Sequence, residues 1–170
     1  SVFFDLQSRL SKNIYLTFGS RFDDHSIAGN EDSHRATFAY LFDDKSLKIK
    51  SSYGTGFRFP SLYEMFFVYA ANSDSINFVK AENSKSFDIG FEKFISDKNL
   101  NIEATYFNIK YDDVLEGWET GTSSGSAYTT QNMPGEVKSQ GLEINSQWFP
   151  TDSVNFELNY TYTSTYDGAE

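Results

Sequence analysis

Cysteine is absent from this 170-residue chain, basic residues are fewer than acidic ones, and no long apolar run is present. Without cysteine, the chain can form neither disulfides nor thiolate metal sites. A formal net charge of −10 argues against nucleic acid as a partner, because binding to phosphates requires clustered Lys and Arg. A membrane-spanning helix needs about 18 consecutive apolar residues, and no run in this chain is that long.

Signals for export and catalysis are also missing. The first residues have neither the basic region nor the apolar core of a signal peptide, so for an exported protein we expect that signal to lie upstream. There is no nucleophile elbow, no glycine-rich phosphate loop and no helical pair of metal-binding histidines. The adjacent acids Asp112 and Asp113 would point to opposite faces of a strand, which does not suit a general acid and base. The sequence therefore predicts no enzyme.

Aromatic residues, by contrast, are abundant. They make up 18% of the chain, with 17 Phe and 11 Tyr, although only 39% of all residues are hydrophobic. A transmembrane β-barrel has this kind of composition, because alternate residues of its strands face lipid while the others stay polar. A soluble β-sandwich is also compatible with the composition alone.

Alternation of apolar and polar residues predicts roughly eight strands. The apolar positions recur with period two within 2–10, 14–23, 36–42, 47–53, 87–92, 100–106, 142–148 and 154–162. Near Asn108 they shift by one residue to Ile109 and Tyr111, which indicates a β-bulge or the point where the strand leaves the membrane. Strands of roughly 9 to 12 residues fit a tilted crossing of a bilayer.

The connections between these strands are short and long in turn. Short turns are expected near residues 11–13, 43–45, 96–99 and 150–153, and long polar loops near 24–33, 56–83 and 113–132. This separation is typical of an outer-membrane barrel, and a soluble sandwich has no reason to show it. The sequence predicts an all-β fold: an antiparallel, up-and-down transmembrane β-barrel segment with short periplasmic turns and long extracellular loops.

One run, Tyr-Gly-Thr-Gly-Phe-Arg-Phe-Pro-Ser-Leu-Tyr-Glu at 53–64, marks the end of a predicted strand. Its glycines relax the backbone where the strand leaves the sheet. Pro60 has no N–H to donate, so the β-ladder must stop there. Arg58, Tyr63 and Glu64 would then lie at the mouth of a barrel, where they could contact a plug or a ligand, or serve only as a rigid loop stem.

This run resembles the Gly-[ST]-Gly-Phe-[RK]-x-Pro-[ST]-Leu-x-Glu segment of TonB-dependent outer-membrane receptors. Three later segments, at 79–92, 104–114 and 138–143, are similar to further motifs of that family in the same order. Each motif is weak alone, whereas four in order are specific. Phe59 and Ala81 depart from the commoner Ala and Pro of the family, which puts the identity of the ligand in doubt.

The resemblance implies that residues 1–170 are part of the C-terminal half of a receptor barrel of about 22 strands, with the plug domain and the remaining strands absent. Such a receptor lies in the outer-membrane lipid of a Gram-negative bacterium. It binds a ferric siderophore, cobalamin or a similar small-molecule nutrient and imports it with energy that TonB passes to the plug. The motifs are closest to the cobalamin and catecholate-type branches. Haem receptors of the family typically carry a His between the first two motifs, and here no His lies between Pro60 and Glu82, which counts against haem as the ligand.

Two groups of candidate site residues follow from the resemblance. Ligand contacts are expected in the extracellular loops, from Arg58, Tyr63, Glu64, Tyr69, Trp118 and Tyr128. The loop 113–132, with its Gly- and Ser-rich middle and its aromatic anchors, looks like a mobile loop and is a candidate lid over the ligand. Plug contacts are expected from charged residues of the lumen: Arg21, Lys50, Asp88, Glu92 and Glu143. Four more charged residues are assigned to the same inner face: Asp23, Lys48, Glu103 and Lys138.

A group of acidic residues in the predicted loop 24–33 and just before it is a weak candidate for a metal site. Asp23, Asp24, Glu31 and Asp32 supply hard oxygen donors of the kind that Ca²⁺ prefers, and two histidines lie nearby. No EF-hand spacing is present, and a solvated acidic loop explains the same residues. Beyond a possible Ca²⁺ ion, no cofactor is expected.

Three alternatives to a receptor segment remain open. The chain could be a complete small eight-stranded outer-membrane barrel with a structural or adhesive role, a soluble β-sandwich that binds a ligand, or a membrane-embedded barrel enzyme with His25 and His34 at its rim. A segment of a larger barrel would leave two unpaired strand edges, which the hydrocarbon core does not tolerate. We therefore expect that the isolated chain does not insert as a functional pore.

Overall fold

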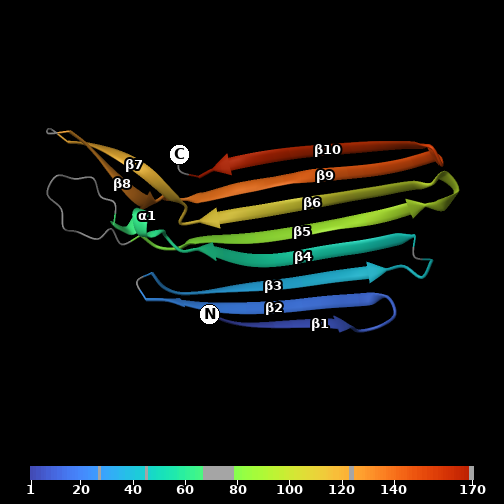
Figure 1. Cartoon of the computed structure of the whole chain (residues 1–170), viewed down its shortest axis with the longest axis horizontal. Coiled ribbons are helices and arrows are strands. Elements are labelled where there is room, and N and C mark those ends of the chain that lie inside the picture. The colour runs from blue at the N-terminus through green and yellow to red at the C-terminus, as the bar shows by residue number, and fades with distance from the viewer. Residues whose placement is uncertain (27, 45, 67–78, 123–124, 169–170) are drawn as a thin grey trace.

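The structure, a computed structural model, describes residues 1–26, 28–44, 46–66, 79–122 and 125–168. Its main feature is one antiparallel sheet of eight strands whose spatial order follows the chain, with a separate two-stranded hairpin near one end (Figure 1). The sheet strands are β1 (Val2–Arg9), β2 (Ile14–His25), β3 (Gly29–Leu41), β4 (Leu47–Arg58), β5 (Glu82–Ile95), β6 (Leu100–Asp112), β9 (Glu136–Thr151) and β10 (Val154–Asp167). The hairpin pairs β7 (Leu115–Thr122) with β8 (Gly125–Asn132), and the helical elements are α1 (Leu62–Phe66) and the 3₁₀ turn η1 (Ser96–Lys98).

The eight-stranded sheet is open. In the described part of the chain β1 pairs only with β2, and β10 pairs only with β9, so the first and last strands do not meet. A small closed barrel would require that pairing. The described residues also contain no second sheet packed over the first, and among the side chains whose burial the structure describes, the buried apolar ones are Pro60, Met65 and Ala81. The fold is therefore an up-and-down sheet, neither a closed small barrel nor a sandwich.

The sheet has one apolar and one polar face, because successive residues of a strand point to opposite sides. One row of cross-strand partners on the apolar face consists of Leu16, Phe38, Ser51, Ile89, Tyr106, Leu142 and Tyr162. The neighbouring row on the polar face includes Lys50, Gly90, Thr105 and Glu143. In the described residues no helix is long and apolar enough to cross a membrane. The alternation predicted from the sequence is confirmed.

The two ends of the sheet differ in their connections. The turns β1–β2, β3–β4, β5–β6 and β9–β10 lie at one end, which we call the short-turn end (Figure 1). At the other, the long-loop end, lie α1, the β7–β8 hairpin and the β2–β3 connection. The predicted separation of short and long connections is confirmed, with corrections to two of the long ones.

Both corrections concern strand pairing in polar sequence. The long loop predicted at 24–33 is wrong, because β2 and β3 stay paired up to His25 and Gly29 and leave only a tight turn. Similarly, the segment 113–132 is a hairpin rather than a loop without regular structure. In both places the strands have polar residues on both faces, so the apolar period that reveals a strand is missing.

The β-bulge considered near Asn108 is also wrong. The register of β6 with both neighbours continues without interruption past this residue. The apolar parity shifts because Phe107, Ile109 and Tyr111 all point to the polar face, where the ring of Phe107 lies over Gly141 of β9. The register shifts instead between β9 and β10, where Phe149 and Pro150 together face Asn155. A proline fits such a position because it cannot donate to the ladder.

Candidate functional site at the loop stems

The chain leaves the sheet at the end of β4 and turns at once into α1. Ser61 and Glu64 form a capping box: the Glu64 backbone N–H donates to Ser61 Oγ at 3.2 Å, and the Ser61 N–H donates to Glu64 Oε2 at 2.7 Å. Pro60, just before the cap, is buried. The Pro-Ser-Leu-x-Glu sequence therefore fixes the direction in which the chain departs from the strand.

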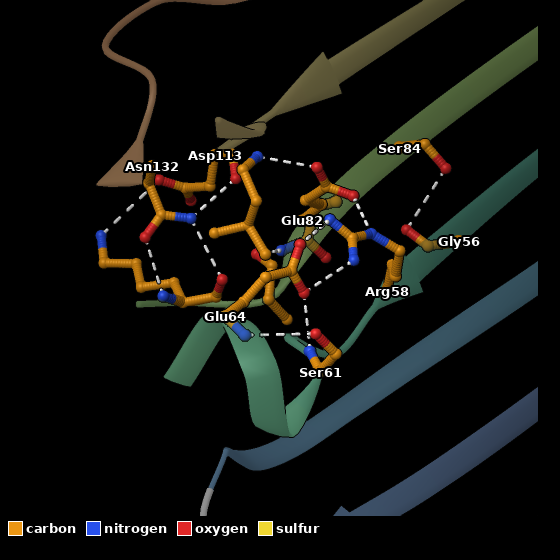
Figure 2. A network of polar contacts seen from close by, with 12 residues as sticks. Gly56, Arg58, Ser61, Glu64, Glu82, Ser84, Asp113 and Asn132 are labelled. Carbon is orange, nitrogen blue, oxygen red and sulfur yellow. Dashed lines mark hydrogen bonds and ion pairs between the residues drawn. The ribbon is translucent and has the colours of Figure 1, made fainter. Parts of the chain in front are cut away.

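Arg58, the last residue of β4, connects three elements (Figure 2). Its Nη1 and Nη2 donate to the two carboxylate oxygens of Glu64, each at 3.0 Å, and its Nε donates to Glu82 at the start of β5. The second oxygen of Glu82 accepts the backbone N–H of Leu115 at 2.7 Å. One guanidinium thus joins β4, α1 and β5 and, through Glu82, the first residue of the β7–β8 hairpin.

Asn132 closes the base of the same hairpin. Its Oδ1 accepts the Lys80 backbone N–H at 2.8 Å, and its Nδ2 donates to the carbonyls of Lys80 at 3.0 Å and Asp113 at 2.7 Å (Figure 2). The side chain therefore binds the segment before β5 to both ends of the hairpin. We call Arg58, Ser61, Glu64, Glu82 and Asn132 the loop-stem network.

A small packed core lies with this network. Met65 of α1, Ala81 and Thr130 of β8 have exposed fractions of only 3%, 1% and 8%. In the eight-stranded sheet only Gly90 and Gly141 are buried, so the described chain packs most closely around this network. Hydrogen bonds and packing together make the stems of the two longest connections a single unit.

Ion pairing sets the charge state of the network. Hydrogen bonds from the Arg58 guanidinium lower the pKa of Glu64 to about 2, against an ordinary value of 4.5, although partial burial acts in the opposite direction. The same guanidinium also lowers the pKa of Glu82, and its two carboxylate partners raise the pKa of Arg58. At neutral pH all three groups are therefore charged.

The low pKa of Glu64 predicts how the loop stem responds to acid. Because the folded-state pKa is lowered, the stabilisation is fully present above pH 4.5 and is lost as the pH falls through about 2. We expect the carboxyl carbon of Glu64 to titrate near pH 2 in an NMR titration with ¹³C-labelled glutamate, and to titrate at higher pH in an Arg58→Ala variant. An unshifted titration at 4.5 in the wild-type protein would contradict the ion pair.

The predicted ligand contacts are distributed unevenly around this network. Arg58 and Glu64 lie inside it, whereas Tyr63 lies on α1 with an exposed side chain. Trp118 lies on β7 and Tyr128 on β8, in adjacent cross-strand pairs of the hairpin. Their side chains lie outside the described part of the structure. Tyr69 is also outside the described residues. That these residues contact a ligand stays a prediction.

Sequence reasoning did not single out three members of the network. Ser61 could have been found, because Ser-x-x-Glu before a helix is a capping-box signature. Glu82 belongs to a family-like motif, but only the fold places it beside Arg58, 24 residues earlier in the chain. Asn132 gives no signal, since its partners Lys80 and Asp113 come from two other segments.

The polar face carries a second charged cluster. Lys50 on β4 contacts Glu92 on β5 at 3.0 Å and also pairs with Glu103 on β6, and Lys48 contacts Glu92 at 3.0 Å. These side chains are half-buried, with exposed fractions from 29% to 37%. Ion pairs across strands thus satisfy these charges within the sheet itself.

The other predicted lumen residues lie on the same face, except for one. Arg21 pairs with Asp23 at 2.6 Å, Asp88 accepts a hydrogen bond from Ser52, and Glu143 lies exposed on the same side. The assignment of Lys138 to the inner face is wrong, because uninterrupted pairing of β9 places it on the side of Leu142. Whether the inner residues contact a plug stays a prediction.

The acidic candidates for a metal site do not converge. Asp23 and Glu31 are cross-strand partners on the polar face, whereas Asp24 and Asp32 point to the opposite side. Asp23 is also engaged by Arg21. Among the residues that the structure describes, no three His, Cys, Asp or Glu side chains come together as possible metal ligands. The structure therefore adds no support for a Ca²⁺ site.

Comparison with known proteins relates the chain to one family. A family model described as "TonB dependent receptor-like, beta-barrel" matches residues 1–170. The vitamin B12 transporter BtuB of Vibrio cholerae serotype O1 is 25% identical over 139 residues, which cover 82% of this chain and 20% of that protein. The chain thus spans about a fifth of the length of the curated relatives that it matches.

Solved structures agree with this match. The siderophore receptor PirA of Pseudomonas aeruginosa superposes with a TM-score of 0.83 at 20% identity, covering 96% of this chain and 33% of that one. A variant of the ferric enterobactin receptor PfeA from the same species, in complex with enterobactin, superposes with a TM-score of 0.76 at 21% identity, covering 95% and 27%. At these identities the likeness establishes the fold.

Proposed function

The chain belongs to the TonB-dependent receptor-like β-barrel family, and on this premise we propose that it forms part of a transporter that binds a scarce nutrient outside the cell and imports it. Proteins of this family are outer-membrane β-barrels of Gram-negative bacteria and act as transporters, not as enzymes. In such a barrel the apolar face of the sheet contacts lipid and the polar face lines the lumen. The long-loop end is then extracellular and the short-turn end periplasmic.

The loop-stem network carries this proposal. A receptor must present its extracellular loops in a defined arrangement, because ordering them on binding would reduce the affinity for the ligand. Arg58 and Glu82 fix α1, which carries Tyr63, and the start of the β7–β8 hairpin to the same two strands. The loop stems at the mouth of the barrel are therefore ordered before a ligand binds, and they can hold ligand-binding side chains in fixed positions.

The open sheet supports a further part of the proposal, that these eight strands are one sector of a larger barrel. The outer edges of β1 and β10 lack strand partners in the described structure, and hydrocarbon does not tolerate unpaired backbone groups. In the complete protein, which we call the intact receptor, further strands would pair with these edges. A plug domain would face the polar side of the sheet and pass on the energy supplied by TonB.

The solute is proposed only as a class. The printed names of the relatives refer to vitamin B12, to a siderophore and to enterobactin. These ligands share large size and scarcity, and several hydrogen-bonding groups would be needed to recognise each. We therefore propose a ferric siderophore, cobalamin or a similar nutrient.

Uptake by cells tests the proposal directly. A strain that lacks its own receptors and expresses the intact receptor is given ⁵⁵Fe-loaded siderophores or ⁵⁷Co-labelled cobalamin. We expect one of these solutes to accumulate, and accumulation to stop in a matched strain without TonB. Accumulation that persists without TonB would refute active import. Absence of uptake for every solute, with adhesion of cells instead, would favour a structural or adhesive role.

A further inference from the structure

Three lysines stand side by side on the apolar face of the sheet. Lys85 on β5 pairs directly with Lys110 on β6, and Lys110 pairs directly with Lys138 on β9. Contacts between neighbouring side chains confirm which face this is: Tyr106 Oη and Asn108 Nδ2 both donate to Gln140 Oε1 at 3.2 Å. These three residues and the lysines lie on the same side, because strand residues two or four apart share a face.

This row is unusual for two reasons. Like charges directly opposite one another on neighbouring strands are destabilising, and here three occur in succession. They also occur in a chain with a net charge of −10. The lysine side chains have exposed fractions of 57%, 42% and 38%, so the ammonium groups remain accessible to solvent or lipid.

Two carboxylates only partly neutralise the row. Glu136 contacts Lys110 at 3.0 Å and Lys138 at 2.7 Å, and Asp112 is 3.9 Å from Lys85. Both acids lie two residues farther along their strands toward the long-loop end than Lys110 and Lys138, away from Phe87 and the rest of the apolar band. Moving along the face, apolar residues are thus followed first by cations and then by anions.

We propose that this lysine row binds the phosphate groups of a phosphorylated lipid in the outer leaflet of the membrane. The inference rests on the proposed function, which makes this face the lipid-exposed exterior and the long-loop end extracellular. Lysine stems lie along apolar surface while their ammonium groups reach the headgroup level. Adjacent strands are about 4.8 Å apart, so the three ammonium groups can engage two phosphates of one headgroup.

The carboxylates give the proposal a second, opposite consequence. Because Glu136 competes with phosphate for Lys110 and Lys138, removing its charge should strengthen lipid binding, whereas removing the lysines should weaken it. A change that merely damaged the fold would weaken binding in both variants. The pair of variants therefore separates a phosphate site from an effect on folding.

Native mass spectrometry of the intact receptor in detergent, with diphosphoryl lipid A as the probe, tests this site. We expect the wild type to retain the lipid, a Lys110→Gln/Lys138→Gln variant to bind it about thirtyfold more weakly, and Glu136→Gln to bind it more tightly. The matched control Lys12→Gln/Lys98→Gln removes the same charge from the short-turn end and should bind like the wild type.

Other outcomes would overturn the proposal. Equal lipid retention by the Lys110/Lys138 variant and the wild type would show that the row is not the site. Complete displacement of the lipid by inorganic phosphate would indicate a simple anion site. The lipid-binding measurements use no nutrient. If lipid binding fails, the uptake experiment still tests the proposed function, and if uptake fails, the lipid-binding result can still be interpreted.

Discussion

Replacing Arg58 with Ala in the intact receptor is expected to reduce nutrient binding strongly while the barrel still assembles. The substitution leaves two partly buried carboxylates, Glu64 and Glu82, close together without their shared cation. A local cost of about 1–3 kcal/mol follows from unsatisfied groups of this kind. It would lower the population of the ordered loop stem, and the apparent affinity with it, by about 5- to 150-fold.

Hydrogen exchange locates this effect in the structure. The backbone N–H groups of Ser61, Glu64 and Leu115 donate to side chains of the network, so their exchange should accelerate in the variant. Arg58→Lys is the matched control, because it keeps the charge but cannot donate to both carboxylates through a planar fork, and it should give an intermediate result. Normal binding by Arg58→Ala, or unchanged exchange at these three amides, would show that the network does not hold the loops.

Replacing Gly141 with Ala is expected to prevent assembly of the barrel. A Cβ atom at this position would lie 2.1 Å from the Tyr162 carbonyl oxygen of β10 and 2.7 Å from the Phe107 ring. The ring could move, but the backbone oxygen belongs to the β9–β10 ladder, so the two strands would have to separate. We expect the heat-resistant folded species to disappear in electrophoresis of outer-membrane preparations.

Two further variants make the result specific. Phe107→Ala should not rescue Gly141→Ala, because the more severe overlap is with the backbone. Gly117→Ala on β7, where a Cβ atom would meet nothing within 4 Å, should assemble like the wild type. If Gly141→Ala assembled normally, the close approach of β9 and β10 would be wrong.

The sequence predicts the strands well where one face is apolar and the other polar. Leu16, Phe38 and Leu142 reveal their strands because hydrocarbon selects for apolar side chains at every second position. Beyond the membrane that selection ends, and strand pairing around Glu31 or Tyr128 leaves no periodic pattern. The missed hairpin and the extended β2–β3 pair lie in just such segments.

The site was predicted in part for a different physical reason. Arg58 and Glu64 are close in sequence and share a local motif, so they could be singled out together. Glu82 and Asn132 act over 24 and 52 residues of separation, and only the order of strands brings them to the same place. The charge of Lys138 suggests an inward position, but the register of β9 places it on the side of Leu142.

The attachment of the β7–β8 hairpin has an evolutionary consequence. Leu115 with Glu82, and Asn132 with Lys80 and Asp113, tie the two ends of the hairpin to the segments beside it. Apart from the buried Thr130, residues between these anchors can therefore be lengthened, shortened or replaced without disturbing the ladder hydrogen bonds of the eight-stranded sheet. Under the proposed function, a lineage that keeps the anchors can exchange this hairpin as a module, and so adopt a new nutrient while inheriting the same barrel.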